Sequence, residues 1–183
     1  PDNKWAAFGV DTLSRRKYNI HIKNLETGEV LDEVIPLTTG TSTWANDNKT
    51  LFYTHKDEQT LRSSKIYRHE RGTDIENDVL IFSEDDETFG TYVYKTKSKK
   101  YLVIGSYSTL TSEFQILKAD DPEGQFKVFQ PRVRGLEYNI SHFGDHFYIL
   151  TNKDGASNFK LMKTSENTTE QEKWEEVIAH RDD

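Results

Sequence analysis

The chain has 183 residues and a formal net charge of −7, and 30% of its residues are charged. A negative balance argues against nucleic acid as a partner, because phosphate binding depends on Lys and Arg. No apolar run approaches the roughly 18 residues that a membrane-spanning helix needs, so we expect no membrane partner either. The chain has no cysteine, which fits a reducing compartment, and we expect a cytoplasmic protein.

Short apolar runs recur in the same order along the whole chain. Equivalent runs begin at Tyr18, Ile66, Phe114 and Phe159, which are 48, 48 and 45 residues apart. Their β-branched and aromatic residues alternate with polar ones, which is typical of half-buried strands. Turn-forming sequences such as Glu26-Thr27-Gly28 separate them. The sequence therefore consists of four similar segments, each of about 47 residues.

The predicted strands follow the chain in these segments. Residues 1–37 contain three of them, at Trp5–Phe8, Tyr18–Ile22 and Val30–Ile35. Residues 38–84 contain four, at Ser42–Trp44, Leu51–Tyr53, Ile66–Tyr67 and Val79–Phe82. Residues 85–131 contain four, at Thr91–Tyr94, Tyr101–Ile104, Phe114–Ile116 and Phe126–Phe129. Residues 132–183 contain Glu137–Ile140, Phe147–Leu150, Phe159–Leu161 and Trp174–Ile178. The polar stretch Ser165–Glu176 before the last strand predicts a loop with at most one helical turn.

Four strands in each segment predict an all-β fold, a partial β-propeller of about four four-stranded antiparallel blades. The first blade is incomplete, because the strand that opens the other three has no counterpart before Trp5. A propeller closes its ring with about 4 to 8 blades, and the chain begins without Met. We therefore expect a piece of a longer polypeptide. The sheet faces at its two ends would be exposed, so we also expect the isolated chain to self-associate.

The motifs of familiar catalytic and cofactor sites are missing. The candidates for a nucleophile elbow, at Gly40–Trp44 and Gly105–Ser108, lack the closing glycine that the sharp turn requires. The six histidines do not form the H-E-x-x-H spacing of a zinc site, and no P-loop occurs. We therefore predict no catalytic residue, no metal and no cofactor in this chain.

Two charged clusters remain as candidate interaction residues. Glu84, Asp85, Asp86 and Glu87 follow one another between a closing strand and the next opening strand. Such a run is usually a solvated loop, but it could also attract basic peptides. Arg15 and Arg16 lie in the first segment, in the loop between its first two strands. They could form ion pairs at the surface or between domains, or contact a substrate. Because strand direction alternates, both loops and the segment 132–134 should emerge on one face.

Several short motifs in one collinear order resemble a known family. They include the following runs: Leu13-Ser14-Arg15-Arg16-Lys17-Tyr18, Lys23-Asn24-Leu25-Glu26-Thr27-Gly28, Trp44-Ala45-Asn46-Asp47, Tyr67-Arg68-His69 and Trp174-Glu175-Glu176. Each motif is weak alone, but together the chain resembles the propeller of oligopeptidase B, or protease II, in the prolyl oligopeptidase family. The resemblance extends over the whole chain.

The resemblance implies a function for the parent protein. Members of this family are serine peptidases, and oligopeptidase B cleaves short peptides after Arg or Lys. Their catalytic triad lies on an α/β-hydrolase domain, and the propeller caps that domain and restricts access to it. This chain lacks the hydrolase domain, so no catalytic residue can be transferred and the chain alone should be inactive. Its expected partners are that domain and short basic peptides.

Two alternatives remain open from the residues alone. The chain could be an independent propeller-like module that binds a peptide or protein on its loops. A propeller that hydrolyses carbohydrate would need two inward-facing acids at catalytic separation. The opening strands supply only one acid, Glu137, among Thr91, Tyr92, Tyr94 and Asn139.

Overall fold

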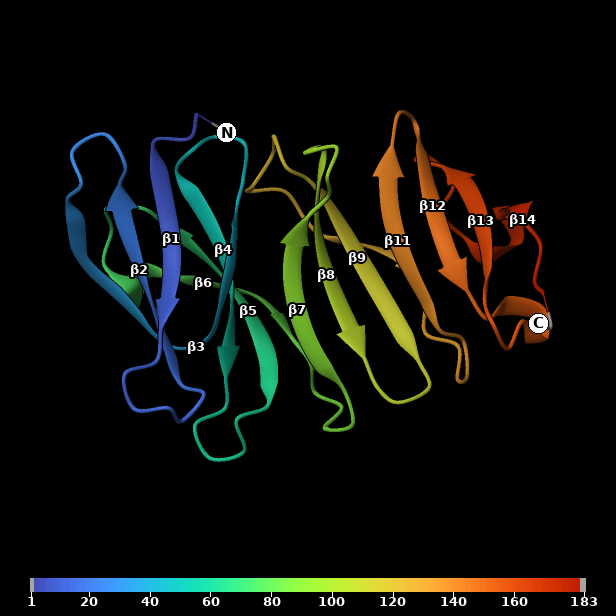
Figure 1. Ribbon diagram of the computed structural model, residues 1–183, viewed down its shortest axis with the longest axis horizontal. Coiled ribbons are helices and arrows are strands. Elements are labelled where there is room, and N and C mark those ends of the chain that lie inside the picture. The colour runs from blue at the N-terminus through green and yellow to red at the C-terminus, as the bar shows by residue number, and fades with distance from the viewer. Residues whose placement is uncertain (1, 182–183) are drawn as a thin grey trace.

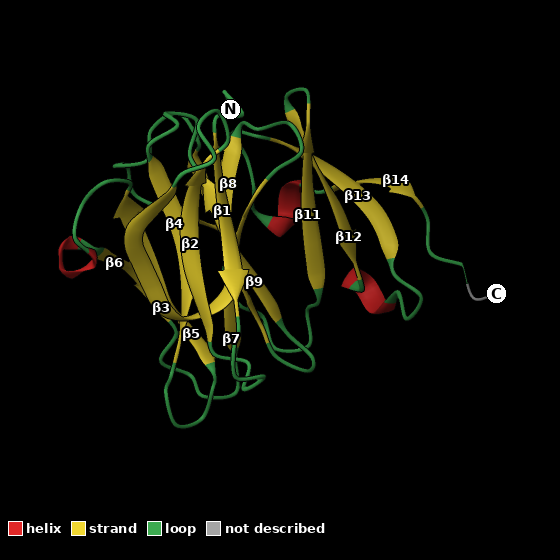
Figure 2. Ribbon diagram, turned by 60° about the vertical axis from the view of Figure 1, so that its left-hand side comes forward, coloured by secondary structure: helices red, strands yellow, loops and turns green. Residues whose placement is uncertain are grey.

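The computed structural model describes residues 2–181, and the described chain is almost entirely strand and loop (Figure 2). In chain order the strands are β1 (Trp5–Val10), β2 (Tyr18–Asn24), β3 (Val30–Trp44), β4 (Thr50–Lys56), β5 (Ser63–Glu70), β6 (Val79–Ser83), β7 (Gly90–Lys95), β8 (Tyr101–Tyr107), β9 (Ser112–Lys118), β10 (Lys127–Gln130), β11 (Tyr138–Phe143), β12 (His146–Thr151), β13 (Lys160–Ser165) and β14 (Glu175–Ile178). Three short 3-10 turns, at Ile75–Asn77, Lys153–Gly155 and Gln171–Lys173, complete the elements. Among the described residues, no helix is long and apolar enough to cross a membrane.

The strands form antiparallel sheets that lie side by side along the long axis of the molecule (Figure 1). Strands β7 to β10 form one four-stranded sheet, and β11 to β14 form another. Strands β1 to β6 form a single six-stranded sheet. Each strand pairs with its neighbour in the chain, so connections are short and local. This is the architecture of consecutive propeller blades.

The six-stranded sheet corrects one detail of the sequence prediction. Val30–Ile35 and Ser42–Trp44 were predicted as two strands, but both belong to the 15-residue strand β3. The first half of β3 pairs with β2, and its second half pairs with β4. Thr38 takes part in both pairings, opposite Tyr18 and opposite His55. A strand can therefore leave one blade and enter the next without a separate loop.

Glycine makes this crossing possible. Gly40 lies in β3 with a φ of +83°, a conformation that few other residues adopt. A β-carbon on Gly40 would lie 2.8 Å from the ring of Tyr18. A β-carbon on Gly9 of β1 would lie 2.4 Å from the Cα of Gly40. Gly9 thus lets the backbones of β1 and β3 approach closely, and Gly40 leaves room for the ring of Tyr18.

Three apolar cores lie between neighbouring blades. The first contains Ile20, Ile22, Ile35, Leu51 and Tyr53. The second contains Ala45, Phe52, Ile66, Val93, Leu102, Ile104, Leu117 and Ala119. The third contains Tyr101, Val103, Phe114, Phe129, Leu136, Tyr138, Ile140, Phe147, Ile149, Met162 and Trp174. Because side chains alternate along a strand, β4 sends Leu51 into the first core and Phe52 into the second. Strands β4 and β8 are thus buried on both faces, which explains their unbroken apolar runs.

Candidate domain-docking face

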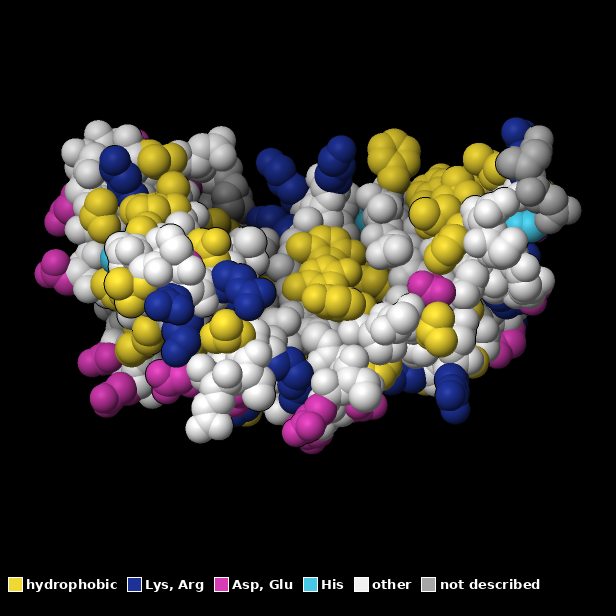
Figure 3. Space-filling model, turned by 60° about the horizontal axis from the view of Figure 1, so that its bottom comes forward, with side chains coloured by type: hydrophobic (Ala, Val, Ile, Leu, Met, Phe, Trp, Pro, Cys, Tyr) yellow, Lys and Arg dark blue, Asp and Glu magenta, His cyan; other side chains and the backbone are white. Residues whose placement is uncertain are grey.

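Six loops emerge on one face of the molecule, which we call the loop face (lower edge in Figure 1). They are the β1–β2, β4–β5, β6–β7, β8–β9, β10–β11 and β12–β13 loops, residues 11–17, 57–62, 84–89, 108–111, 131–137 and 152–159. Strict antiparallel order puts alternate connections on the same side of the sheets. The prediction that the loops of Arg15 and Glu84 share a face with Arg132 is therefore confirmed. Figure 3 shows this face tilted toward the viewer.

The β1–β2 loop presents Arg15 and Arg16 to solvent. The carboxylate of Asp11 shapes it by accepting hydrogen bonds from the backbone N–H groups of Arg15 (3.2 Å) and Arg16 (2.7 Å). Desolvation alone would raise the pKa of Asp11, but these backbone N–H groups outweigh it and lower the pKa. Neither guanidinium has an ion pair within residues 2–181.

The β6–β7 loop holds Glu84, which is buried with 4% of its surface exposed. The guanidinium of Arg132 balances the negative charge of Glu84. Its Nη1 lies 3.2 Å from Oε1 of Glu84, and its Nη2 contacts Oε2. The guanidinium also lies 4.0 Å from the ring centre of Phe89 and forms an ion pair with Glu113 at 3.3 Å. Burial opposes the charge of Arg132, but Glu84 and Glu113 outweigh it and raise its pKa. This cluster joins the loops on either side of the β7–β10 sheet.

A second arginine, Arg62, holds the β6–β7 loop in place by donating hydrogen bonds to backbone carbonyls of that loop. Its Nη1 donates to the carbonyls of Asp86 (3.0 Å) and Phe89 (2.9 Å), and its Nη2 donates to the carbonyl of Glu84 (2.9 Å). The side chain of Asp86 accepts from Thr88, which lowers the pKa of Asp86. The loop is therefore held in one conformation from both neighbouring blades.

The four acidic residues differ in what they offer a partner. Glu84 is buried and paired, whereas Asp85, Asp86 and Glu87 are exposed. Asp85 accepts a hydrogen bond from Ser83 at 3.1 Å. The acidic loop and the Arg15 loop share a face but have no hydrogen bond or ion pair with each other in the described structure. Lys17 instead pairs with Glu58 of the β4–β5 loop at 3.5 Å.

Sequence reasoning missed the role of Arg62 and the pairing of Arg132 with Glu84. Arg62 binds backbone carbonyls, which every residue carries, so no sequence pattern marks its targets. Glu84 and Arg132 are 48 residues apart, which is about one repeat length. That spacing was a usable signal, because the repeat places equivalent loops of adjacent blades side by side.

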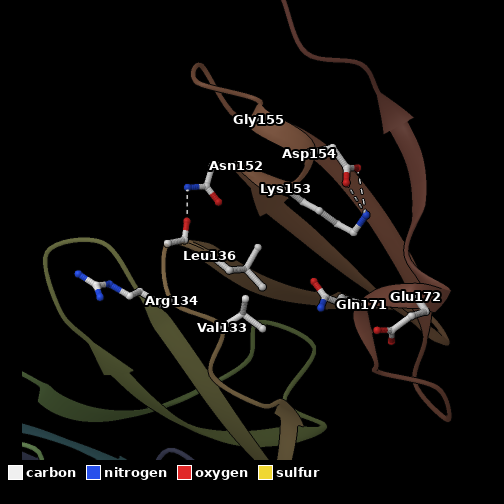
Figure 4. Close-up of a pocket in the computed structure, with 10 residues that line it drawn as sticks. Val133, Arg134, Leu136, Asn152, Lys153, Asp154, Gly155, Gln171 and Glu172 are labelled. Atoms are coloured by element: carbon white, nitrogen blue, oxygen red, sulfur yellow. Dashed lines mark hydrogen bonds and ion pairs between the residues drawn. The ribbon is translucent and has the colours of Figure 1, made fainter.

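Several hollows open among these loops. One of about 460 Å³ is lined by Asp86, Thr88, Phe89, Ser108, Thr109, Leu110, Thr111, Arg132 and Arg134. Another of about 590 Å³ lies between the β10–β11 loop, the β12–β13 loop and the 3-10 turn Gln171–Lys173 (Figure 4). In it Lys153 pairs with Asp154 at 2.9 Å, and the Nδ2 group of Asn152 donates to the carbonyl of Gly135 at 2.9 Å (Figure 4). Neither lining contains a serine or cysteine paired with a base.

A Ser–His–carboxylate line does occur away from the loop face. Ser98 Oγ lies 2.9 Å from Nδ1 of His142, and Nε2 of His142 lies 3.2 Å from Glu166. The same Glu166 oxygen also binds Lys100 at 2.5 Å and Tyr101 at 3.2 Å, so its charge is already shared. None of the hollows described above adjoins the hydroxyl. Among residues 2–181, no group of three or more His, Cys, Asp or Glu could hold a metal ion.

Comparison with known proteins identifies the family. The family model for the prolyl oligopeptidase N-terminal beta-propeller domain matches residues 1–183. Dipeptidyl aminopeptidase BI of Pseudoxanthomonas mexicana is 38% identical over 182 residues, which are all of this chain and 25% of that protein. Protease 2 of Moraxella lacunata is 37% identical over 149 residues, which are 80% of this chain and 21% of that protein.

Solved structures agree with the sequence relatives. Oligopeptidase B from Leishmania major superimposes with a TM-score of 0.92 at 31% identity, over 100% of this chain and 26% of that one. Oligopeptidase B from Trypanosoma brucei, in a closed form with covalently bound antipain, gives a TM-score of 0.87 at 28% identity over 100% of this chain and 25% of that one. In these structures the propeller is packed with a C-terminal hydrolase domain of the same chain. The predicted all-β partial propeller is therefore confirmed.

The chain spans about a quarter of the length of these relatives. The family assignment rests on the whole of its sequence and of its fold. This chain belongs to the N-terminal β-propeller domain of the prolyl oligopeptidase family of serine peptidases.

Proposed function

We propose that the chain is a noncatalytic part of a serine oligopeptidase and gates the access of short peptides to a hydrolase domain. The observation that carries the proposal is the match of the whole chain to the propeller of oligopeptidase B, with a TM-score of 0.92. A cap of stacked sheets excludes folded proteins by size. The loop face is the surface that we assign to the contact with the hydrolase domain.

The charged loops have separate roles in this proposal. Arg15 and Arg16 are exposed on a loop that Asp11 holds in place. We assign them to ion pairs across the cleft between the two domains. Asp85 and Glu87 are exposed carboxylates on a rigid loop. Their negative potential would raise the local concentration of peptides with Arg or Lys, and salt would screen it.

The names of the relatives support two specificities. Oligopeptidase B and Protease 2 favour cleavage after Arg or Lys within a short peptide, as the resemblance implies. The 38% identical relative is named a dipeptidyl aminopeptidase, which favours removal of dipeptides from a free amino terminus. We prefer the first, because the structure with the TM-score of 0.92 is an oligopeptidase B.

Reporter peptides decide between these specificities in the full-length protein. An arginyl amide with a blocked amino terminus should be cleaved, and a matched dipeptidyl amide with a free amino terminus should be cleaved no faster. A folded protein with an exposed Arg should resist cleavage, whereas its denatured peptides are cut. Exclusive cleavage of the free dipeptidyl reporter would reject the oligopeptidase assignment, and equal cleavage of the folded protein would reject gating.

Substitutions that remove negative charge test whether the acidic loop attracts basic peptides. The double variant Asp85→Asn, Glu87→Gln should raise KM for arginyl peptides at low salt and leave kcat unchanged. The matched control is Glu123→Gln in the β9–β10 loop, on the face opposite the loop face, which should change neither constant. A salt dependence of kcat/KM identical to that of the unmodified protein would remove the steering role without affecting the family assignment.

A further inference from the structure

Two buried histidines lie in the seams between neighbouring blades. His69 is the next-to-last residue of β5, and His142 is the next-to-last residue of β11. Both strands begin at the loop face, so both imidazoles lie near the opposite face of the molecule. Their side chains are 0% and 1% exposed. Each ring is therefore in a place where its protonation state affects how two blades pack.

His69 lies between two carboxylates. Its Nδ1 is 2.7 Å from Oδ1 of Asp78, and its Nε2 is 3.2 Å from Oε2 of Glu33. Glu33 belongs to the first half of β3, in the first blade, and Asp78 precedes β6 in the second. An ionised carboxylate only accepts hydrogen bonds, so both ring nitrogens must donate, and only the imidazolium has two donors. His69 thus joins the two blades in its protonated form.

The other groups around His69 fit this assignment. Tyr53 donates to the second oxygen of Asp78 at 2.8 Å, and the backbone N–H of Gly72 donates to Glu33 at 2.8 Å. Arg71, two residues along the chain, places its guanidinium 3.7 Å from the ring centre of Trp5 and forms no ion pair with either carboxylate within residues 2–181. The imidazolium is therefore the charge that offsets these two carboxylates.

His142 has different partners. Its Nδ1 lies 2.9 Å from the hydroxyl of Ser98, which can donate, and its Nε2 lies 3.2 Å from Glu166. Glu166 is already paired with the ammonium of Lys100 at 2.5 Å and accepts from Tyr101 at 3.2 Å. Ser98 and Lys100 belong to the third blade, and His142 and Glu166 to the fourth. A neutral ring satisfies all these bonds by accepting from Ser98 and donating to Glu166.

The remaining surroundings of His142 also favour the neutral ring. The rings of Tyr101 and Phe147 contact the imidazole edge-on, with centroids at 4.9 and 4.8 Å. Asp145 lies nearby but forms its ion pair with His146 at 2.5 Å. A second proton would place a cation among aromatic rings and close to Lys100.

We propose that the two seams loosen under opposite changes of pH: alkalinisation loosens the seam that His69 bridges, and acidification loosens the seam that His142 bridges. This property goes beyond the proposed peptidase function and does not depend on it. It makes the packing of the blades tight only within a band of pH. Outside that band, different ends of the domain open first.

The pKa shifts of the two groups have the signs that this requires. Burial pushes the pKa of His69 down, but Asp78 and Glu33 outweigh burial and raise it above 6.5. The closed seam then holds one more proton than the open seam as the pH rises above 6.5, so alkali favours opening. Burial lowers the pKa of His142 below 6.5, and Lys100 adds to this effect while Glu166 opposes it. The open seam then binds a proton below about pH 6.5 that the closed seam does not, so acid favours opening.

Amide hydrogen exchange on the full chain tests the proposal locally. After correction for intrinsic rates, peptides from β5 and residues 30–35 should exchange faster at pH 9 than at pH 6.5. Peptides from β11 and residues 96–101 should exchange faster at pH 5 than at pH 7.5. Each unit of pKa difference corresponds to about a tenfold change in the opening constant. Opening of both seams in the same direction of pH would overturn the proposal.

Substitutions separate the two histidines from global effects. His69→Gln should abolish the alkaline response alone, and His142→Gln should abolish the acid response alone. The matched control is His21→Gln in β2, whose ring stacks on Phe8 at 5.6 Å and bridges no seam. It should leave both responses intact. A pH response that survives the loss of its own histidine would refute the assignment.

Charge variants that keep both histidines cover the case in which those variants do not fold. Glu33→Gln removes one of the two carboxylates and should move the midpoint of the alkaline response to lower pH. Lys100→Met removes the cation that shares Glu166 and should move the midpoint of the acid response to higher pH. Unchanged midpoints in both variants would also refute the proposal.

Discussion

The pairing of Glu84 with Arg132 makes a quantitative prediction about stability. Glu84 is 4% exposed, so replacing Arg132 with Met leaves a buried carboxylate without its partner. Breaking a fully buried pair costs about 3 to 5 kcal/mol. The Arg132 side chain is 28% exposed and solvent reaches the pair, so we expect a smaller cost than for a fully buried pair, about 2 to 3 kcal/mol. Part of that loss comes from the contact with Phe89.

A double-mutant cycle measures the pairing itself. Glu84→Gln keeps the shape of the side chain and removes its charge, so it should cost less, about 1 kcal/mol. In the double variant the charge of Glu84 is gone, and Met no longer leaves it unpaired. The free energies of unfolding from urea titrations should therefore show a coupling of about 1 to 2 kcal/mol. Costs that add within about 0.5 kcal/mol would show that the two groups do not stabilise the loop together.

Three further predictions test the cores and the exposed end. Leu102→Ala, in the second core, should cost about 2 to 5 kcal/mol of unfolding free energy, whereas Leu25→Ala, at a site that is 52% exposed, should stay within about 0.5 kcal/mol; equal losses in urea titrations would contradict the packing. Gly105→Ala should cost about 1 to 3 kcal/mol, because its β-carbon would lie 2.6 Å from the ring of Tyr92; an unchanged melting temperature would contradict this contact. Phe143 is 76% exposed on the last sheet, so Phe143→Lys should weaken the self-association that we predict for the isolated chain, and a chain that sediments as a monomer at all concentrations would refute that prediction.

The sequence predicted the strands well, because burial imposes a pattern on them. In β11 buried and exposed residues alternate from Tyr138 to Phe143, and from Tyr138 to Ser141 apolar and polar residues alternate in the same way. The stretch Ser165–Glu176, predicted as a loop with at most one helical turn, contains the 3-10 turn at Gln171–Lys173. The continuity of β3 could not be predicted, because it depends on Gly9 and Gly40, which meet only when the blades are packed.

The candidate site was predictable only in part. Alternating strand direction was enough to place the charged loops on one face. It did not reveal that Glu84 is buried while Glu87 is exposed, although both belong to one acidic run. Their difference comes from Arg132, in a loop one repeat further along the chain. The histidines lack the spacing of a zinc site, and no sequence pattern indicates that His69 faces two carboxylates and His142 a shared one.

The polar contacts at the seams have a reason in the packing of the blades. Apolar contact between two sheets has no direction, and by itself it would tolerate small shifts of one blade along the next. Hydrogen bonds and ion pairs tolerate much smaller shifts, since their geometry is narrow. Asn46 illustrates this, because its Nδ2 group donates to the carbonyl of Lys99 and to Asp120, both at 2.8 Å, across the second seam.

Such contacts occur at both edges of the third blade. On the loop face Arg62, through the carbonyl of Phe89, and Arg132, through Glu113, hold it to its two neighbours. On the opposite face Asn46 and Glu166 do the same. Contacts at both edges resist rotation of one blade against the next, which a contact at a single edge would allow. Loss of one edge should therefore let the blades pivot about the other while the apolar core stays buried. This is why we expect pH to loosen one seam locally, through its histidine, before the domain unfolds.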